Sequence, residues 1–169
     1  MNKQEFLAFS LPYGLKTINV NYIEEDILII RDFLSIDFNG NIKVDGIVMP
    51  LNCNITAHKP ILHPLSDLTK EIDHNGKKFV PMVELAKISY PERYVSLFAY
   101  RDGIIKAEID FEDYYVHLYF DGKDFVSDSS IQNQFKLFQK LIEWHFDIAG
   151  LIEKGEAIDV NTLSENPYK

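Results

Sequence analysis

The stretch Tyr94–Gly122, YVSLFAYRDGIIKAEIDFEDYYVHLYFDG, decides the fold class of this chain. Apolar and polar residues alternate along it in short runs rich in β-branched and aromatic side chains, which is the pattern of half-buried strands. Asp-Gly pairs, which favour tight hairpin turns, occur in it at Asp102 and at Asp121. The pattern predicts an antiparallel β-meander over residues ~94–126. Its strands are predicted at Val95–Tyr100, Ile104–Phe111 and Tyr114–Phe120.

The middle strand of this stretch carries a row of carboxylates. Glu108, Asp110 and Glu112 alternate with apolar residues, so they are predicted to share one face at a spacing of about 7 Å. Such a row suits a hard cation such as Mg²⁺ or Ca²⁺, or an acidic recognition surface, while an ordinary solvated strand face is the simplest interpretation. With Asp113, these residues form the candidate acidic binding surface. The core-facing side is predicted to carry Ala107, Ile109 and Phe111.

Acidic residues also surround this strand. Residues 101–128 hold eight acidic and three basic side chains, a net charge of −5 out of −9 for the whole chain. Affinity for nucleic acids comes mainly from Lys and Arg, so direct nucleic-acid binding is not expected. A negative net charge favours solubility or a basic protein partner. We therefore expect a protein partner.

Residues ~15–57 show the same alternation of strands and turns and predict another β-meander. Leu15–Tyr22 and Asp26–Phe33 are rich in β-branched and apolar residues. Two short strands are predicted after them, NIKV at 41–44 and IVMPL at 47–51. Hairpin-turn dipeptides flank the first of these, at Asn39-Gly40 and Asp45-Gly46.

Prolines mark the segment between the two meanders. Pro60 and Pro64 bracket KPILHPL, which predicts a stiff connector. Ser66 is a suitable N-cap for a short helix that ends near His74-Asn75-Gly76. Two further elements are predicted in this segment, a strand at Lys77–Val80 and a second short helix at Met82–Ile88.

The C-terminal part of the chain predicts one long helix from about Ile131 to Lys154, with Ser127–Ser130 before it and Gly155 after it. The charged residues of this helix fall on one narrow stripe, and His145 projects almost opposite that stripe. We therefore expect His145 to be a buried structural histidine that donates one ring proton to a core acceptor. The tail EAIDVNTL after Gly155 again alternates and is expected to dock on the body of the protein.

A second interpretation makes His145 a proton-transfer group in a pocket. Burial lowers the pKa of a histidine, which suits a base. A catalytic base also needs a nucleophile or an acid within hydrogen-bond reach, and the sequence offers no partner for this role. We therefore predict no catalytic residue.

These elements together predict an α+β fold in a single domain of 169 residues. The fold is expected to combine antiparallel β-meanders, two short central helices at ~66–88, and one long C-terminal helix packed on the sheet.

The remaining composition points to no cofactor and no metal. His58, His63 and His74 lack the short Cys/His spacing of a metal site, and nucleophile or phosphate-cradling motifs are absent from the sequence. Cys53 is the single cysteine, which favours a reducing compartment. No signal peptide and no apolar run long enough to span a membrane is visible, so a cytoplasmic protein is expected.

Three blocks of sequence support a family resemblance. They are LPYGLK at Leu11–Lys16, KPILHPLSDLTKEIDHNGKKFVPMVEL at Lys59–Leu85 and EWHFDIAGLIEKGEAIDVNTL at Glu143–Leu163, about a third of the chain. In this combination and order the chain resembles a group of small phage- and prophage-encoded proteins of Bacteroidetes-type bacteria, a group with no known activity. It departs from them at His63, where arginine is more frequent, and at Glu156, where a more apolar residue is found. The resemblance implies expression in the cytoplasm of an infected or lysogenic host.

Three functions are compatible with this context. The leading expectation is an accessory protein without enzymatic activity that binds a host or phage macromolecule, possible targets including a bacterial defence nuclease whose basic groove the acidic surface would fill. A small hydrolase or metal-dependent enzyme is the alternative from another class. A minor virion or assembly component is the third.

Overall fold

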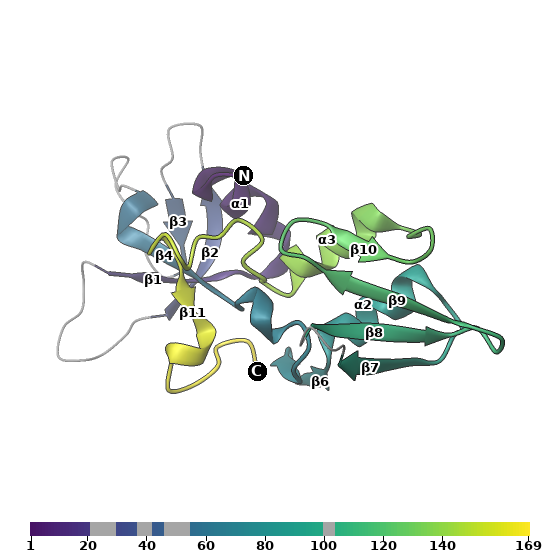
Figure 1. The fold of residues 1–169 in the computed structure, drawn as a ribbon. Coiled ribbons are helices and arrows are strands. Elements are labelled where there is room, and N and C mark those ends of the chain that lie inside the picture. The colour runs from purple at the N-terminus through teal and green to yellow at the C-terminus, as the bar shows by residue number, and fades with distance from the viewer. Residues whose placement is uncertain (21–29, 37–41, 46–54, 100–103) are drawn as a thin grey trace. The chain divides into compact units, whose positions relative to one another are not determined.

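The computed structural model describes residues 1–20, 30–36, 42–45, 55–99 and 104–169, and it has the α+β fold with antiparallel meanders that the sequence predicts (Figure 1). The chain forms two compact units. Unit 1 comprises residues 1–64 and 142–167, and unit 2 comprises residues 65–141 and 168–169. Among the described residues, no helix is long and apolar enough to cross a membrane.

Unit 1 is built on a five-stranded sheet with the strand order β11-β4-β1-β2-β3. β1 (Lys16–Asn19), β2 (Ile30–Ile36) and β3 (Ile42–Val44) form the predicted antiparallel meander. β4 (His58–Leu62) pairs antiparallel with the other edge of β1. The tail strand β11 (Ile158–Asp159) joins β4 in parallel, which confirms that the C-terminal tail docks. The dipeptide Asn39-Gly40, Gly46 and the predicted strand at 47–51 lie outside the described residues.

The first helix, which the sequence analysis did not predict, contributes to the core of unit 1. α1 (Lys3–Ser10) starts with a capping box, in which the Asn2 side chain accepts the Glu5 N–H and the Glu5 carboxylate accepts the Asn2 N–H, both at 2.9 Å. One core cluster of unit 1 consists of Phe6, Leu7, Leu15, Phe33, Ile42, Val44, Leu62, Leu151 and Ala157. Short 3-10 turns complete the unit at Leu11–Tyr13, Ile55–Ala57 and Val160–Thr162.

The predicted connector at Pro60–Pro64 is wrong, because Pro60 lies inside β4. The hydrogen bond from the Val20 N–H to the Ala57 carbonyl marks a hydrogen-bonded pair of the β1–β4 ladder. Such pairs alternate along an antiparallel ladder, so the Thr17–Pro60 pair falls at a non-bonded position. The missing N–H of proline therefore costs no ladder bond to β1, and the pairing with β11 begins only at Ile61.

The predicted long helix is also wrong in extent, because α3 covers only Gln134–Glu143. His145, two residues later, has a φ of 58°, outside the helical region. The His63 N–H donates to the His145 carbonyl at 2.8 Å, and the Asp147 N–H donates to the His63 carbonyl at 2.9 Å. This parallel bridge between His63 and Phe146 extends β4 and stops the helix. Tertiary hydrogen bonds thus override the local helical pattern.

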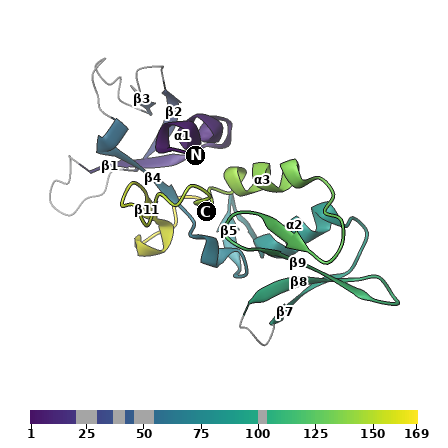
Figure 2. The same cartoon turned by 45° about the horizontal axis from the view of Figure 1, so that its top comes forward.

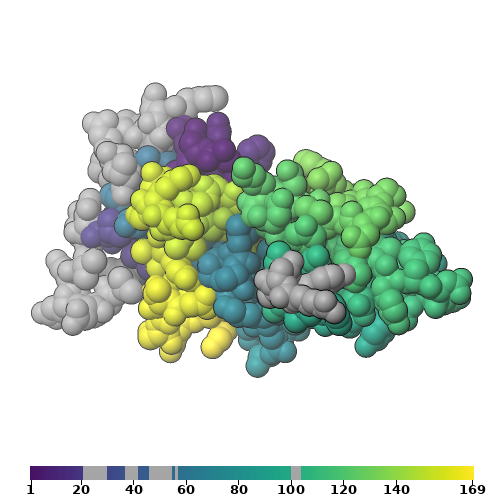
Figure 3. Space-filling model, viewed as in Figure 1, coloured from purple at the N-terminus to yellow at the C-terminus, as the bar shows by residue number. Residues whose placement is uncertain are grey.

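Asp147, predicted to lie on the charged outer stripe of the helix, is buried instead. Its two carboxylate oxygens accept the N–H groups of Leu151 and Ile152, both at 2.8 Å. The turn that follows reverses at Gly150, where a φ of 64° suits glycine. Asp147 therefore caps the segment that brings Leu151 into the core of unit 1. In the space-filling view this C-terminal part of unit 1 (yellow) forms a continuous stretch of surface (Figure 3).

Unit 2 contains the meander from which the fold class was predicted. β7 (Val95–Ala99), β8 (Ile105–Asp110), β9 (Tyr115–Phe120) and β10 (Phe125–Ser127) form an antiparallel sheet in the order β10-β9-β8-β7. The predicted turn at Asp121 is confirmed. Its carboxylate accepts the N–H groups of Asp124 and Lys123, and these bonds lower the pKa of Asp121. The predicted turn at 102–103 lies outside the described residues.

One face of this sheet is covered by helices (Figure 2). α2 (Pro81–Ser89), a predicted helix, contacts β7 and β8. Phe138 of α3 packs on the rings of Phe125 and Phe120, with centroids 5.4 and 6.2 Å away. The predicted packing of the C-terminal helix on a sheet therefore holds for α3, although the helix is short.

The predicted helix after Ser66 is wrong. Leu65–Asp67 forms a single 3-10 turn, and the chain then makes a small hairpin of β5 (Ile72–His74) and β6 (Lys77–Phe79). The two turn residues Asn75 and Gly76 have φ values of 53° and 73°. Positive φ at both central positions is the requirement of a type I′ hairpin turn, for which Asn-Gly is preferred. The dipeptide that was interpreted as a helix stop is therefore a hairpin signal.

We expect Asp147→Ala to destabilise the protein by about 1–3 kcal/mol, because it leaves two backbone N–H groups in a largely buried turn without their acceptors. Urea-induced unfolding measures the change. Glu153→Ala, an exposed change in the same segment, is the control and should alter the unfolding free energy by less than about 0.5 kcal/mol. Equal effects of the two substitutions would contradict the capping role of Asp147.

We also expect the protein to lose stability in mild acid through His58. Burial lowers the pKa of His58 below its ordinary value of 6.5, and the charge of Lys3 lowers it further. The stabilising effect of neutral His58 is therefore full above the unfolded-state pKa and is lost as the pH falls from there through the folded-state pKa. Unfolding free energies measured between neutral pH and mild acid should fall less steeply for His58→Gln than for the wild type. Parallel pH profiles would show that His58 does not carry this loss.

Candidate functional site

The face of the unit 2 sheet opposite α2 and α3 is the candidate site. Ala107, Ile109, Val116 and Leu118 are buried on the helix-covered side. Cross-strand partners share a face of an antiparallel sheet, so the register assigns the other side as well. We call it the open face, and it consists of three cross-strand rows: Tyr94–Asp110–Tyr115, Ser96–Glu108–His117–Asp128, and Phe98–Lys106–Tyr119–Val126.

The first row places a carboxylate between two exposed rings. The Asp110 N–H donates to the Tyr94 carbonyl at 3.0 Å, and Asp110 pairs with Tyr115 on its other side. The side chains of Tyr94 and Tyr115 are 74% and 58% exposed. Asp110 is held by its own turn, since its Oδ1 accepts the Glu112 N–H at 2.7 Å. This row therefore presents one fixed negative charge flanked by two aromatic side chains.

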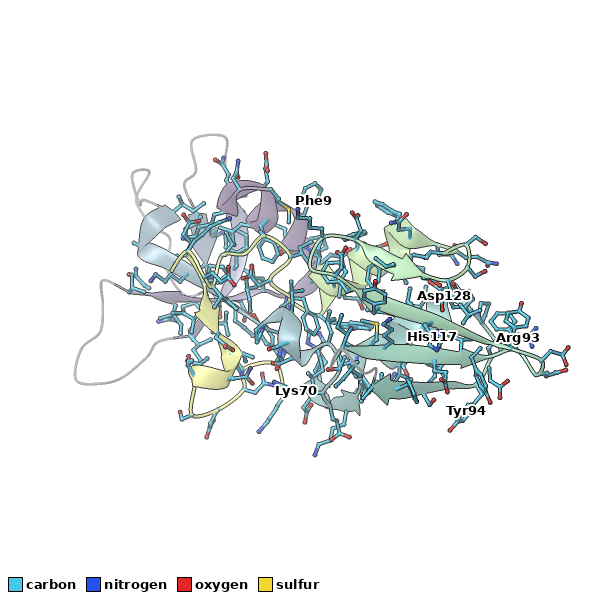
Figure 4. The ribbon with its side chains drawn as sticks, viewed as in Figure 1. Phe9, Lys70, Arg93, Tyr94, His117 and Asp128 are labelled. Atoms are coloured by element: carbon cyan, nitrogen blue, oxygen red, sulfur yellow. The ribbon has the colours of Figure 1, made fainter. Side chains whose placement is uncertain are left out.

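The second row is centred on His117, a residue that the sequence analysis did not single out. Its Nδ1 lies 2.6 Å from Asp128 Oδ2, and its Nε2 lies 3.6 Å from Glu108 Oε2. Figure 4 shows the side chains of His117, on β9, and of Asp128, which directly follows β10. The first distance is that of a hydrogen bond to a carboxylate, whereas the second is too long for one. His117 thus holds Asp128 against the sheet and separates the two acidic side chains.

The third row is aromatic and carries the cation of the open face. The Lys106 ammonium lies 4.7 Å from the centroid of the Tyr119 ring, a cation–π contact within the sheet. Phe98 at the β7 edge is 46% exposed. The open face therefore combines exposed aromatic side chains with the three carboxylates Glu108, Asp110 and Asp128.

The predicted carboxylate row is correct for Glu108 and Asp110 only. β8 ends at Asp110, and Glu112 follows in the hairpin turn with a φ of 70°. Glu112 and Asp113 are both exposed at this turn, which follows the open-face residue Asp110 in the chain. Phe111 does not continue the buried row of Ala107 and Ile109.

Phe111 instead belongs to an aromatic cluster at the end of the sheet. Its ring stacks on Tyr114 with centroids 5.1 Å apart, and the Arg93 guanidinium lies 4.6 Å from its centroid. Tyr90, the residue directly after α2, packs edge-on against Phe111, with ring centroids 5.9 Å apart. The exposed Tyr114 and Arg93 extend the aromatic and charged surface around the hairpin turn.

The other histidines are buried and do not assemble into a site. His145 is buried as predicted, although it leaves the helix and is not held on a helix face. His58 Nε2 lies 3.0 Å from Asn19 Nδ2, and the His63 ring packs on Phe146 at 5.4 Å. His74 lies 5.8 Å from the ring of Tyr168. In the part of the chain that the structure describes, no group of three or more His, Cys, Asp or Glu side chains is placed to hold a metal ion.

The open face is therefore suited to recognition. Its carboxylates attract cationic groups, and its exposed rings offer large apolar and π surfaces beside them. Comparisons with family models, with curated proteins and with solved structures find no match to this chain.

We expect neutral His117 to carry its ring proton on Nδ1, because this nitrogen donates to the Asp128 carboxylate. Long-range ¹H–¹⁵N NMR spectra identify the tautomer. In Asp128→Ala the acceptor is lost, and we expect a shift toward the Nε2-protonated form. An unchanged tautomer in the variant would mean that Asp128 does not orient the His117 ring.

Proposed function

We propose that this chain is a binding protein without enzymatic activity, and that its open face docks on a basic surface of a protein partner. The row Tyr94–Asp110–Tyr115 carries this proposal. A partner Arg or Lys side chain that meets the Asp110 carboxylate also meets an aromatic ring on either side, which combines an ion pair with cation–π contacts. Tyrosine is also enriched at the energetic centres of protein interfaces.

The charge of the open face selects the class of partner. Glu108, Asp110 and Asp128 face the solvent side of the sheet, and Lys106 lies against Tyr119. Such a face repels a phosphate backbone and attracts Arg and Lys. Charge complementarity therefore favours a basic protein surface over a nucleic acid.

The size of the face sets a condition on the interface. Four strands about 4.8 Å apart and about five residues long cover roughly 14 by 17 Å. This is well below the ~800 Å² that each partner buries in a standard interface. A stable complex must therefore reach beyond the rows, and the exposed Glu112 and Asp113 at the hairpin turn, with Tyr114 and Arg93, are the adjoining surface.

In the biological setting that the family resemblance implies, the protein is a phage- or prophage-encoded accessory protein in the cytoplasm of its bacterial host. The sharper form of the proposal is an inhibitor of a bacterial defence nuclease. Such a nuclease has a basic groove for its substrate, and the carboxylates of the open face and hairpin turn would occupy that groove in place of phosphates.

The test is a charge reversal with a matched control. Glu108→Lys, Asp110→Lys and Glu112→Lys together invert the charge at the open face and its turn. Glu71→Lys, Glu153→Lys and Glu165→Lys change the net charge by the same amount at exposed positions elsewhere. Both proteins and the wild type are used as bait in host lysate, and bound proteins are quantified by mass spectrometry.

We expect one stoichiometric partner that the wild type and the control variant retain and that the open-face variant loses. Thermal unfolding of the control variant should stay close to that of the wild type, because exposed charges contribute little to stability. The open-face variant should still unfold cooperatively but at a somewhat lower temperature, because Asp110→Lys also removes the acceptor of the Glu112 N–H. A partner that binds the open-face variant as well as it binds the control would exclude the open face as the docking surface.

A further inference from the structure

Unit 1 contains a pocket that the proposed binding function does not use. The pocket is open to solvent and has a volume of about 470 Å³. It is lined by the first turn of α1, by Ile55 and Lys59, and by Gly155 and Glu156. Its volume lies within the range of small-molecule sites.

Lys3 is the buried cation of this pocket. Lys3 is only 9% exposed, and among the described residues its ammonium donates one hydrogen bond, to the Ile55 carbonyl at 3.0 Å. An ammonium has three donors, so two remain for another acceptor. Burial lowers the pKa of Lys3, an effect that the Glu156 carboxylate counteracts and Lys59 increases. A buried ammonium with unused donors is costly unless an acceptor completes it.

Lys59 adds a second positive charge to the same wall. It lies on β4 and is half-buried, and its side chain makes no hydrogen bond or ion pair with the residues that the structure describes. Of the described residues that line the pocket, Glu156 is the one with a carboxylate, and it acts on Lys3. The charge of Lys59 is therefore left uncompensated, and the pocket is locally positive in a chain of net charge −9.

The start of α1 faces the same pocket and adds donors. Lys3 and Gln4, the first two residues of this eight-residue helix, have backbone N–H groups without a helical acceptor. The positive end of the helix dipole strengthens their attraction for an anion. Two ammonium-bearing residues and the start of a helix line one cavity, and each of them attracts an anion.

We propose that this pocket binds the phosphate group of a phosphorylated small molecule. Lys59 and the free donors of Lys3 contact the phosphate oxygens, and the N–H groups of the first turn of α1 complete the site. Glu156 balances the charge of Lys3, so the pocket retains one net positive charge for the ligand. A phosphomonoester suits this set of donors better than a carboxylate ligand does, because it carries nearly two negative charges and three acceptor oxygens.

The test uses inorganic phosphate as the probe and Lys59→Gln as the variant. Lys59 is half-buried and unpaired, so its neutralisation is compatible with folding, whereas Lys3 is buried in the fold. Lys43→Gln, an exposed change on β3 of the same unit, is the control. Backbone NMR shifts are followed during a phosphate titration and during a chloride titration of equal ionic strength.

We expect a saturable response to phosphate in the amide signals of Lys3, Gln4 and Gly155, which chloride does not reproduce. Lys59→Gln should weaken the apparent affinity at least tenfold, since a hydrogen bond to a charged group is lost. Lys43→Gln should leave it within about twofold, as expected for a distant surface charge. The charge-reversed open-face variant should bind phosphate as the wild type does.

Two results would overturn the proposal. The first is a phosphate response that does not saturate or that chloride reproduces, which would reduce it to a general salt effect. The second is an equal loss of affinity in Lys59→Gln and Lys43→Gln, which would show that Lys59 makes no specific contact. Neither result bears on the open face, because that proposal is tested by partner capture.

Discussion

His63 fixes the C-terminal segment of unit 1 through two backbone hydrogen bonds, one to the His145 carbonyl and one from the Asp147 N–H. This parallel bridge is short, but it determines the course of the chain from Glu143 to β11. It requires the chain to leave the helix after Glu143, and histidine is one of the residues that tolerates the positive φ observed at His145. It turns Asp147 inward, where its carboxylate caps the next turn. Leu151 and Ala157 then complete the core, and β11 continues the pairing along β4.

The open face of unit 2 follows from a different constraint. A sheet with helices on one side needs apolar residues at alternate positions only. In β8, Ala107 and Ile109 take these positions and are fully buried, so Glu108 and Asp110 are directed to the other side. The carboxylates do not by themselves imply recognition, since any half-buried strand shows this alternation. The case for recognition rests on the side chains that strand pairing places beside these carboxylates. Exposed tyrosines lie on both sides of Asp110, and His117 lies between Glu108 and Asp128.

Sequence patterns predicted the strands of both meanders because period-two alternation is a local signal. The same reasoning failed where distant partners decide the structure. The residues around His145 have a helical pattern, but His63, far away in the sequence, supplies a competing set of backbone hydrogen bonds. Pro60 favoured the prediction of a connector. Only the register of the β1–β4 ladder shows that the missing N–H of this proline removes no hydrogen bond to β1. Asn75-Gly76 is an exception, since this dipeptide is a local hairpin signal that was interpreted as a helix stop.

The candidate sites differ in the same way. Glu108 and Asp110 could be predicted as a pair because they alternate on one strand. Tyr94, His117 and Asp128 come from other segments, and only strand pairing places them beside these two carboxylates. Nothing local predicted the pocket of unit 1, because Lys3, Lys59 and Glu156 come from three separate parts of the chain.

The chain has a net charge of −9, yet it contains two regions of opposite local charge, the acidic open face of unit 2 and the cationic pocket of unit 1. The carboxylates of the open face lie at a surface, where salt screens charges beyond a distance of about 8–10 Å. Lys3 is nearly buried, so its interaction with a bound anion is screened much less. An exposed acidic face is thus suited to steering a basic partner within that screening distance, and a half-enclosed cationic pocket is suited to holding a small anion in contact. The negative net charge of the chain agrees with the acidic open face but gives no sign of the cationic pocket. The affinity of a pocket for a bound anion depends on the few charged groups that line it.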